Sequence, residues 1–429
     1  HARHHEGSTC CAMAETPVEI PSNNGSAPFR SFIFPILFIT SLFFLNFIAR
    51  IIPAPLMPTI EVDLGIGHAQ AGSMFLIISS GYFASILGSG FLSARISHRN
   101  TIVVSAVSLG LALIATSFST NLWAIRSGLL LIGLTSGIYL PSGLSTVTSL
   151  VSPRDWGKAI SIHELAPNTS FVAAPLLAEL LLIVLPWRGV FFLIGLLSLV
   201  MGCAFFRFGK GGAFRGQAPS FAALGIIMRD PSFWIMLVLF CLGISVTLGI
   251  YTMLPLYLVN EHDISRSLAN TYVSLSRVSC IAMVFVGGWV NDRFGPKRSL
   301  GVILALSGLV TVLLGNISGT GIVIAVFLQP LVAAGFFPPA VAAISSIGPA
   351  HMRGVSISLT IPFAFLIGAG LIPTGIGFVG ESGSFGLGIC IVGVLTLLGA
   401  ILSQLLRVEI SRGHEIDPGE EPALSDQAG

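Results

Sequence analysis

The sequence predicts an all-α polytopic membrane protein whose twelve transmembrane helices form two six-helix halves that repeat one another. Charged residues make up only 9% of the 429 residues, whereas a soluble protein carries about 25%. Hydrophobic residues make up 53%, and the mean hydropathy is +0.90. So little charge cannot cover a soluble surface, which excludes aqueous enzymes and disordered scaffolds. A net charge of +2 gives no field that would attract nucleic acid.

Twelve continuous apolar stretches fill most of the chain, and each is close to the roughly 20 residues that cross a bilayer. Strands of a membrane barrel would alternate in polarity over about 10 residues instead. The first half contains predicted spans at 31–58, 70–94, 101–118, 122–150, 159–185 and 188–208. The second half contains predicted spans at 233–259, 267–290, 299–315, 321–347, 354–379 and 384–406. Short loops leave no room for a soluble catalytic domain.

These spans divide the chain into five segments. Residues 1–30 form an N-terminal cytoplasmic segment, and we expect residues 1–12, which begin with His1, to be foreign to the natural chain. Residues 31–208 and 233–407 are the two halves. Residues 209–232 are a Gly-rich central cytoplasmic loop, and residues 408–429 are a polar cytoplasmic tail. The first apolar run is too long for a cleavable signal peptide.

Basic residues predict the orientation, because they concentrate in cytoplasmic loops. If both termini are cytoplasmic, only Arg188 and Arg266 lie outside. Sixteen basic residues then lie inside: Arg3, Arg30, Arg95, Arg99, Arg154, Lys158, Arg207, Lys210, Arg215, Arg229, Arg293, Lys297, Arg298, Arg353, Arg407 and Arg412. We therefore expect a multi-pass protein of the plasma or inner cell membrane, with both termini in the cytoplasm.

A shift of 198 residues brings the two halves into register. It aligns a basic loop pair, two prolines and several glycines: Gly90 with Gly288, Arg95 with Arg293, Arg99 with Lys297, Gly137 with Gly335, Pro141 with Pro339, Pro175 with Pro373 and Gly195 with Gly393. Matches at one ungapped offset indicate a duplicated half. Parallel six-helix halves with a binding site between them are a transporter architecture.

The loop between the eighth and ninth spans carries a motif. From Gly288 to Arg298 its sequence is GWVNDRFGPKR. This resembles the G-x-x-x-D-R-x-G-x-[RK]-[RK] signature of the major facilitator superfamily (MFS). With twelve spans in two halves, the resemblance extends from Phe32 to Arg407. It implies the MFS fold and the activity of a membrane transporter.

The motif residues have separate expected roles. Gly288 would permit close approach of helices, and Gly295 would turn the loop. Asp292 would face the positive N-terminal end of a neighbouring helix. The resemblance implies that Asp292 and Arg293 act as a cytoplasmic latch, closed in one state and broken in the other. Basic residues at the lipid phosphates complete the motif: Lys297 and Arg298.

The first-half copy departs from this pattern. It keeps Gly90, Arg95 and Arg99, but Ala94 replaces the acid and Ser97 replaces the second glycine. We expect the latch here to be weaker or built differently, and the loop to serve mainly as a basic anchor at the membrane.

Ionisable residues inside spans are costly and therefore candidates for function. Six lie within the predicted spans: Arg50, Arg126, His163, Glu164, Glu179 and Arg277. The resemblance implies that their spans 1, 4, 5 and 8 border a central cavity. Arg126 and Glu179, both near outer ends, would form a structural ion pair.

Arg277 is the leading candidate for substrate binding. It follows a polar stripe with helical spacing, namely Ser267, Asn270 and Ser274. A guanidinium in a low-dielectric cavity favours a carboxylate or another oxyanion. A structural role, with an acid or a helix-end carbonyl as partner, is the alternative.

Arg50 is the second candidate, one turn after Asn46. Its surroundings resemble, loosely, the opening of superfamily members that carry organic anions: Arg50, Pro55, Pro58, Gly72 and Ser80-Gly81-Tyr82. Carbonyls freed near the prolines could instead hold this arginine in a structural role.

His163 and Glu164 could carry a coupling proton. Histidine titrates near neutrality, and a glutamate in low dielectric holds its proton more strongly. The pair could equally neutralise basic residues of the cytoplasmic gate.

Together these features predict a secondary active transporter that alternates access by rocking its two halves. The predicted cargo is a small organic or inorganic anion held by Arg277 and Arg50 with Asn46, Ser274 and Asn270, with possible coupling to H+ in symport. Two alternatives stay open: a proton-coupled drug or multidrug efflux antiporter, and a membrane sensor or assembly partner that has lost transport. No enzyme activity, cofactor, metal site or nucleic-acid partner is expected, and the protein should be a monomer in the lipid bilayer. Substrate identity, direction and coupling are open.

Overall fold

The computed structural model describes residues 28–216, 225, 227–347 and 353–406. The N-terminal segment before Pro28 and the tail from Arg407 onward lie outside the described residues. Within those ranges, twelve helical segments are long and apolar enough to cross a membrane, which confirms the predicted fold class. Predicted and observed spans coincide to within two turns of helix.

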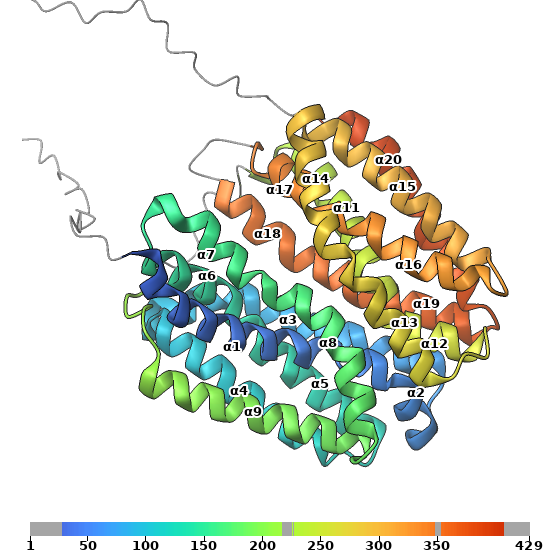
Figure 1. Ribbon diagram of the computed structural model, residues 1–429, viewed down its shortest axis with the longest axis horizontal. Coiled ribbons are helices and arrows are strands. Elements are labelled where there is room, and N and C mark those ends of the chain that lie inside the picture. The colour runs from blue at the N-terminus through green and yellow to red at the C-terminus, as the bar shows by residue number, and fades with distance from the viewer. Residues whose placement is uncertain (1–27, 217–224, 226, 348–352, 407–429) are drawn as a thin grey trace, which may run out of the picture.

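The first half contains six spans (Figure 1). Their helices are η1 (Phe29–Phe32), α1 (Ile33–Ile51) and α2 (Pro53–Leu64); α3 (His68–Ile96); α4 (His98–Ser117); α5 (Leu122–Gly137) and α6 (Tyr139–Leu150); η2 (Pro153–Asp155), α7 (Trp156–His163) and α8 (Leu165–Leu182); and α9 (Trp187–Phe208). Spans 1, 4 and 5 are therefore each built from more than one helical piece.

The second half repeats the plan. Its helices are α11 (Pro231–Ile244), η3 (Ser245–Gly249) and α12 (Ile250–Asn260); α13 (Arg266–Val278) and α14 (Cys280–Phe294); α15 (Pro296–Asn316); α16 (Gly321–Ala334) and α17 (Phe337–Ile344); α18 (Arg353–Leu366), η5 (Ile367–Leu371) and α19 (Ile372–Glu381); and α20 (Phe385–Leu402) with η6 (Ser403–Leu405). The short segments η3 and η5 are π-helices inside spans 7 and 11. Such bulges are rare and are frequent at functional sites.

Glycine pairs show that the duplication extends to helix packing. A Cβ on Gly110 of α4 would lie 2.7 Å from the carbonyl oxygen of Gly195 in α9. At the positions 198 residues later, a Cβ on Gly308 of α15 would lie 2.8 Å from the carbonyl oxygen of Gly393 in α20. Spans 3 and 6 therefore cross backbone to backbone in the same way as spans 9 and 12. Small residues permit such close crossings in membranes.

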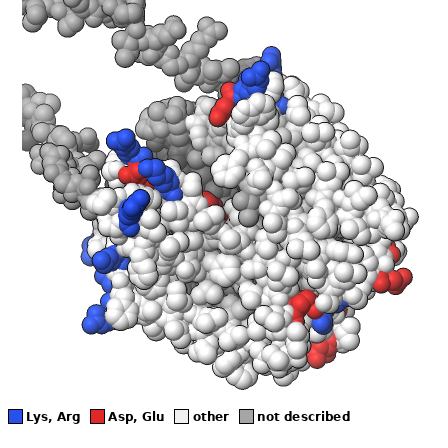
Figure 2. Space-filling model, viewed as in Figure 1, with Lys and Arg blue, Asp and Glu red and all other residues white. Residues whose placement is uncertain are grey.

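Charges divide the molecule into two ends. The basic end carries Arg95, Arg99, Arg154, Lys158, Arg293, Lys297 and Arg298 in its loops, and the acidic end carries Glu61, Asp63, Glu179, Glu261, Asp263 and Glu381. Figure 2 shows Lys and Arg gathered on one side of the molecule and Asp and Glu mainly on the opposite side.

The two halves are in contact at the acidic end. There α2 packs against α12, α8 against α13, and α3 against α19. Toward the basic end the surface is hollowed between the halves (Figure 2). The structure is therefore a conformation that is closed at the acidic end.

Candidate functional site

Arg50 lies in an aromatic cage at the seam between the halves. Its guanidinium carbon is 4.2 Å from the ring centre of Tyr82, 4.7 Å from that of Phe47 and 5.5 Å from that of Phe365. The residue is 8% exposed, and its Nε has no hydrogen-bond partner. Aromatic faces attract a cation, but they do not accept the hydrogen bond that Nε could donate.

A small pocket opens beside this cage. Its volume is about 20 Å³, and residues of both halves bound it: Arg50, Ile51, Phe75, Ile78, Ser79, Tyr82, Leu248, Thr252, Phe365 and Ala369. Arg50 is the basic group of this wall, and Ser79, Tyr82 and Thr252 bring hydroxyl groups. The lining therefore offers one positive charge and several hydroxyl groups, which are groups that bind anions.

Arg277 occupies a second aromatic site. Its guanidinium carbon is 4.9 Å from the ring centre of Tyr251 and 5.1 Å from that of Phe171. One nitrogen donates to the carbonyl of Thr247, 3.0 Å away in the π-helix η3, while Nε has no partner. Arg277 therefore stabilises a carbonyl in the bulge and retains unused donors.

The two arginine sites share one aromatic cluster. Phe47, which packs on Arg50, meets Phe171 edge to face at 5.2 Å, and Phe171 packs on Arg277. In the described part of the chain, no carboxylate forms an ion pair with either arginine. Two buried cations without an acidic partner are costly in a bilayer unless a ligand neutralises their charge.

The three polar residues expected beside the arginines tie helices together. Asn46 donates to the carbonyl of Ser136 at 3.1 Å, and Ser274 donates to the carbonyl of Val172 at 2.6 Å. Asn270 donates to the carboxylate of Glu179 at 2.6 Å and to the carbonyl of Pro55 at 3.1 Å. None of the three lines the pocket beside Arg50, and the substrate role expected for them stays a prediction.

Comparison with known proteins gives the family. The family model described as Major Facilitator Superfamily matches residues 39–287 and 250–426. The chain belongs to the Major Facilitator Superfamily. As a member of this family it is a transporter and not an enzyme.

A bacterial homolog of the human lysosomal transporter Spinster has the same fold as this MFS chain. Its inward-facing, occupied structure matches with a TM-score of 0.75 and 16% identity over 89% of this chain and 97% of the other. The unoccupied inward-facing structure matches with a TM-score of 0.77 and 15% identity over 89% and 98%.

Two curated relatives are similar over shorter stretches. The purine ribonucleoside efflux pump NepI of Shigella sonnei is 29% identical over 34% of this chain and 36% of its own length. The probable sulfoacetate transporter SauU of Cupriavidus necator is 38% identical over 20% of this chain and 21% of its own length. The chain thus spans about a third or less of the length of these relatives.

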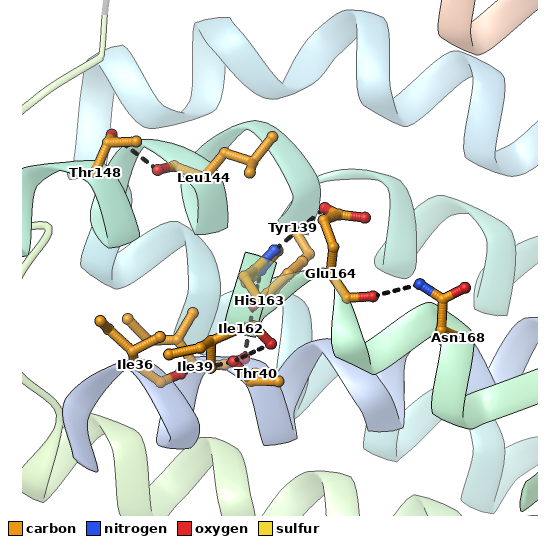
Figure 3. Close-up of polar contacts among 10 residues, drawn as sticks. All are labelled: Ile36, Ile39, Thr40, Tyr139, Leu144, Thr148, Ile162, His163, Glu164 and Asn168. Atoms are coloured by element: carbon orange, nitrogen blue, oxygen red, sulfur yellow. Dashed lines mark hydrogen bonds and ion pairs between the residues drawn. The ribbon is translucent and has the colours of Figure 1, made fainter. Parts of the chain in front are cut away.

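His163 is buried at the end of α7, where span 5 is interrupted between α7 and α8, and it lies beside Tyr139 at the start of α6 in span 4 (Figure 3). The Tyr139 hydroxyl donates to the carbonyl of Ile39 at 2.8 Å, so its oxygen accepts from Nε2 of His163 at 3.2 Å. Nδ1 lies 3.5 Å from Oε1 of Glu164, within ion-pair range but without a well-aligned hydrogen bond. This geometry assigns a hydrogen to Nε2 and leaves Nδ1 without a hydrogen-bond partner.

The surroundings of this pair are asymmetric. His163 is fully buried and stacks on Phe43 at 4.5 Å, whereas Glu164 is 46% exposed. The exposed carboxylate of Glu164 therefore lies beside a fully buried imidazole.

The predicted ion pair between Arg126 and Glu179 is wrong, because Glu179 pairs with a different arginine. Glu179 binds Arg266 at 2.9 Å, while Arg126 donates to the hydroxyl of Ser73 at 3.2 Å and packs on Trp123. The physical reason is that α8 carries Glu179 toward α13 of the other half and not toward span 4.

The second-half motif is exposed in this conformation. Gly295 has φ 78° and turns the loop as expected. Asp292 and Arg293 are exposed, and the described contact of the Asp292 carboxylate is a 3.3 Å hydrogen bond from Asn291. The latch role stays a prediction, as do the roles of Lys297 and Arg298.

The close helix approach expected at Gly288 occurs at its neighbour. A Cβ on Gly288 would meet nothing within 4 Å, whereas a Cβ on Gly287 would lie 2.7 Å from the carbonyl oxygen of Gly335. The helix phase places Gly287 against span 10, so the expectation for Gly288 is wrong.

The first-half motif is held by a loop strap formed by residues 211–216. The N–H groups of His98 and Arg99, at the start of α4, donate to the carbonyls of Phe214 at 3.1 Å and Gly212 at 2.7 Å. Gly216 donates back to the carbonyl of Ser93, near Gly90 in α3. Two residues of the motif differ in exposure and contacts: Arg95 is exposed, and Arg99 donates to the Phe206 carbonyl at the end of α9. The strap therefore binds residues on either side of Ala94, which stands where the motif has its acid.

Sequence reasoning missed Phe47, Tyr82 and Phe365 as the cage of Arg50, and it missed Arg266 as the partner of Glu179. Helical spacing could have found Phe47, which lies three residues before Arg50. Tyr82 and Phe365 come from spans 2 and 11, and only tertiary packing brings them together.

Proposed function

We propose that this MFS transporter is a secondary carrier of a small organic or inorganic anion. It would bind its substrate at the seam and alternate access by rocking its two halves. The supporting observation is the pair of buried guanidiniums, Arg50 and Arg277, on opposite sides of one aromatic cluster without an acidic partner. An anion beside Arg50 would supply the missing countercharge and accept a hydrogen bond from its unpaired Nε.

The relatives support this proposal in part. SauU is named as a probable sulfoacetate transporter, and sulfoacetate carries two acidic groups. NepI is named as an efflux pump for purine ribonucleosides, which favours a neutral aromatic substrate as the rival. A caged guanidinium suits the anion better, because a neutral nucleoside would leave its charge uncompensated.

Orientation follows from the positive-inside rule. We assign the basic end to the cytoplasm and the acidic end to the outside of a plasma or inner cell membrane. The structure would then be inward-facing. Uptake of an anion against a negative-inside potential costs about 2.3 kcal/mol per charge per 100 mV, so uptake requires a co-transported positive charge. We propose that this charge is a proton bound between Nδ1 of His163 and Glu164.

Anion binding is tested on purified protein with a thermal-shift screen. The ligands are carboxylates, sulfonates, inorganic anions, purine ribonucleosides and amphipathic cations. Replacing Arg50 or Arg277 by Gln should weaken binding of the stabilising anion at least tenfold. Arg126→Gln is the matched control, since it also removes a charge from a span but lies away from the pocket, and it should bind within twofold of the parent. Stabilisation by nucleosides or cations that survives both substitutions would contradict the proposal.

Proton coupling needs a separate test in proteoliposomes. His163→Gln and Glu164→Gln should each abolish accumulation driven by a pH gradient, while anion counterflow, which needs no net proton movement, should continue. Accumulation at the parent rate in both variants would exclude this pair as the proton site.

A further inference from the structure

Glu179 joins the two halves at the acidic end. Its carboxylate accepts two hydrogen bonds from Arg266, at 2.9 and 3.3 Å, and a third from Asn270 at 2.6 Å. Arg266 also donates to the hydroxyl of Thr59 at 2.9 Å. Glu179 and Thr59 belong to the first half, whereas Arg266 and Asn270 lie on α13 of the second half. All of these bonds must break when the halves separate here.

Glu381 makes a second connection in the opposite direction. It is the last residue of α19 in the second half, and its Oε2 accepts the backbone N–H of Ala69, at the start of α3 in the first half, at 2.9 Å. A Cβ on Gly67 would lie 2.7 Å from the Glu381 carboxylate, so only glycine leaves room for it. A negative charge at a helix N-terminus is stabilised by the helix dipole.

The internal repeat relates these two connections. Adding 198 to His68, the first residue of α3, gives Arg266, the first residue of α13. Glu179 lies in the last turn of span 5, and Glu381 ends span 11, its counterpart in the other half. In each case a carboxylate from the fifth span of one half binds the start of the second span of the other half.

We propose that Glu179 and Glu381 are a symmetric pair of latches, and that both must detach before the transporter opens at its acidic end. The proposal rests on the alternating access described above, but not on the identity of the substrate. Each latch stabilises only the conformation in which the acidic end is closed, because each joins groups from different halves.

Glu261 offers a matched control. It is also an acid at the acidic end that caps a helix, since its carboxylate accepts the N–H of Gly386 at 2.9 Å and the hydroxyl of Ser384 at 3.3 Å. Both of these partners belong to the same half as Glu261. Removing it therefore removes a similar bond without affecting the contact between the halves.

The test measures the separation of the halves directly. Thr120 and Ser318 are exposed residues at the acidic end, one in each half, and they are related by the same shift of 198. Spin labels at Thr120→Cys and Ser318→Cys, in a background without native cysteines, report the distance between the halves by pulsed electron paramagnetic resonance in nanodiscs. No ligand is added, so the result does not depend on anion binding.

Glu179→Gln and Glu381→Gln should each raise the fraction of molecules with the longer distance at least threefold, and the double variant should raise it further. Glu261→Gln should match the parent. The exchange Glu179→Arg with Arg266→Glu should restore the short distance, which a purely destabilising change would not do.

An unchanged distance distribution in both single variants, with the protein monodisperse, would overturn the proposal. An equal response to Glu261→Gln would also overturn it, because the effect would then be a general loss of stability. Loss of anion binding with a normal latch response would instead count against the substrate site alone.

Discussion

At the scale of single residues, function in this protein depends on a few charges placed where a bilayer protein rarely has them. Arg50 and Arg277 share a cluster of aromatic rings, and the unpaired Nε of each points to a missing partner. Their position inside spans was predictable from the sequence, because ionisable residues stand out against an apolar background. Their aromatic partners were not predictable, since these come from spans far apart in the chain.

Ser97 provides a prediction at this scale. Its φ of 81° and ψ of 158° nearly match those of Gly295, its repeat partner, at 78° and 162°. Only glycine adopts this region easily, and strain of this kind costs about 1–3 kcal/mol. Ser97→Gly should therefore stabilise the protein by about 1 kcal/mol, although it loses the weak helix cap that Ser97 gives Asn100. Thermal unfolding in detergent measures the change.

Ser97→Ala is the control for this prediction. It removes the same cap but keeps the strained backbone, so it should lower the unfolding temperature. A lower unfolding temperature for Ser97→Gly as well would mean that the hydroxyl matters more than the strain.

At the scale of elements, helix crossings divide into close and open ones. The sequence predicted which positions repeat, including Gly195 and Gly393, but glycine counts alone did not reveal which glycines are in contact. Gly288 and Gly287 illustrate the limit, because Gly287 packs against Gly335 whereas Gly288, next to it on the same helix, meets no neighbour. The predicted contact was at Gly288 and the observed contact is at Gly287, because packing against span 10 decides which face of the helix points inward.

The crossing of α15 and α20 gives the second prediction. Gly308→Ala would place a methyl group 2.8 Å from the backbone of Gly393, so it should destabilise the protein by about 1–3 kcal/mol. Gly88→Ala, in α3, meets nothing within 4 Å and should be neutral or stabilising, because alanine favours a helix. Thermal unfolding of the two variants side by side is the measurement. Equal unfolding temperatures would show that the helices can separate at no cost.

At the scale of the whole molecule, two halves meet along a seam that is closed at one end. Composition, span count and the 198-residue repeat were sufficient to predict this architecture. They could not predict the conformation, because the same sequence must close at either end during transport. The misassigned partner of Glu179 has the same origin: Arg266 belongs to the other half, and only the closed acidic end brings it near.

The third prediction concerns orientation. If the basic end is cytoplasmic, green fluorescent protein joined after the last residue should fluoresce, since it folds only on the cytoplasmic side of a bacterial inner membrane. Alkaline phosphatase at the same point should be inactive, because it needs the opposite compartment. Inserted in the loop at Thr120, the phosphatase should be active. The reverse pattern would place the acidic end inside.

The loop strap of residues 211–216 changes where the chain can be divided. The strap follows the last helix of the first half in sequence, yet its carbonyls supply the acceptors for the start of α4. We therefore expect the first half to need the residues up to Gly216, and not only those up to Phe208, to cap the start of α4. Two separately expressed polypeptides should therefore reassemble into one transporter only when the first includes residues 209–216. A fusion of two ancestral halves would then have made the first half dependent on the segment that joins it to the second.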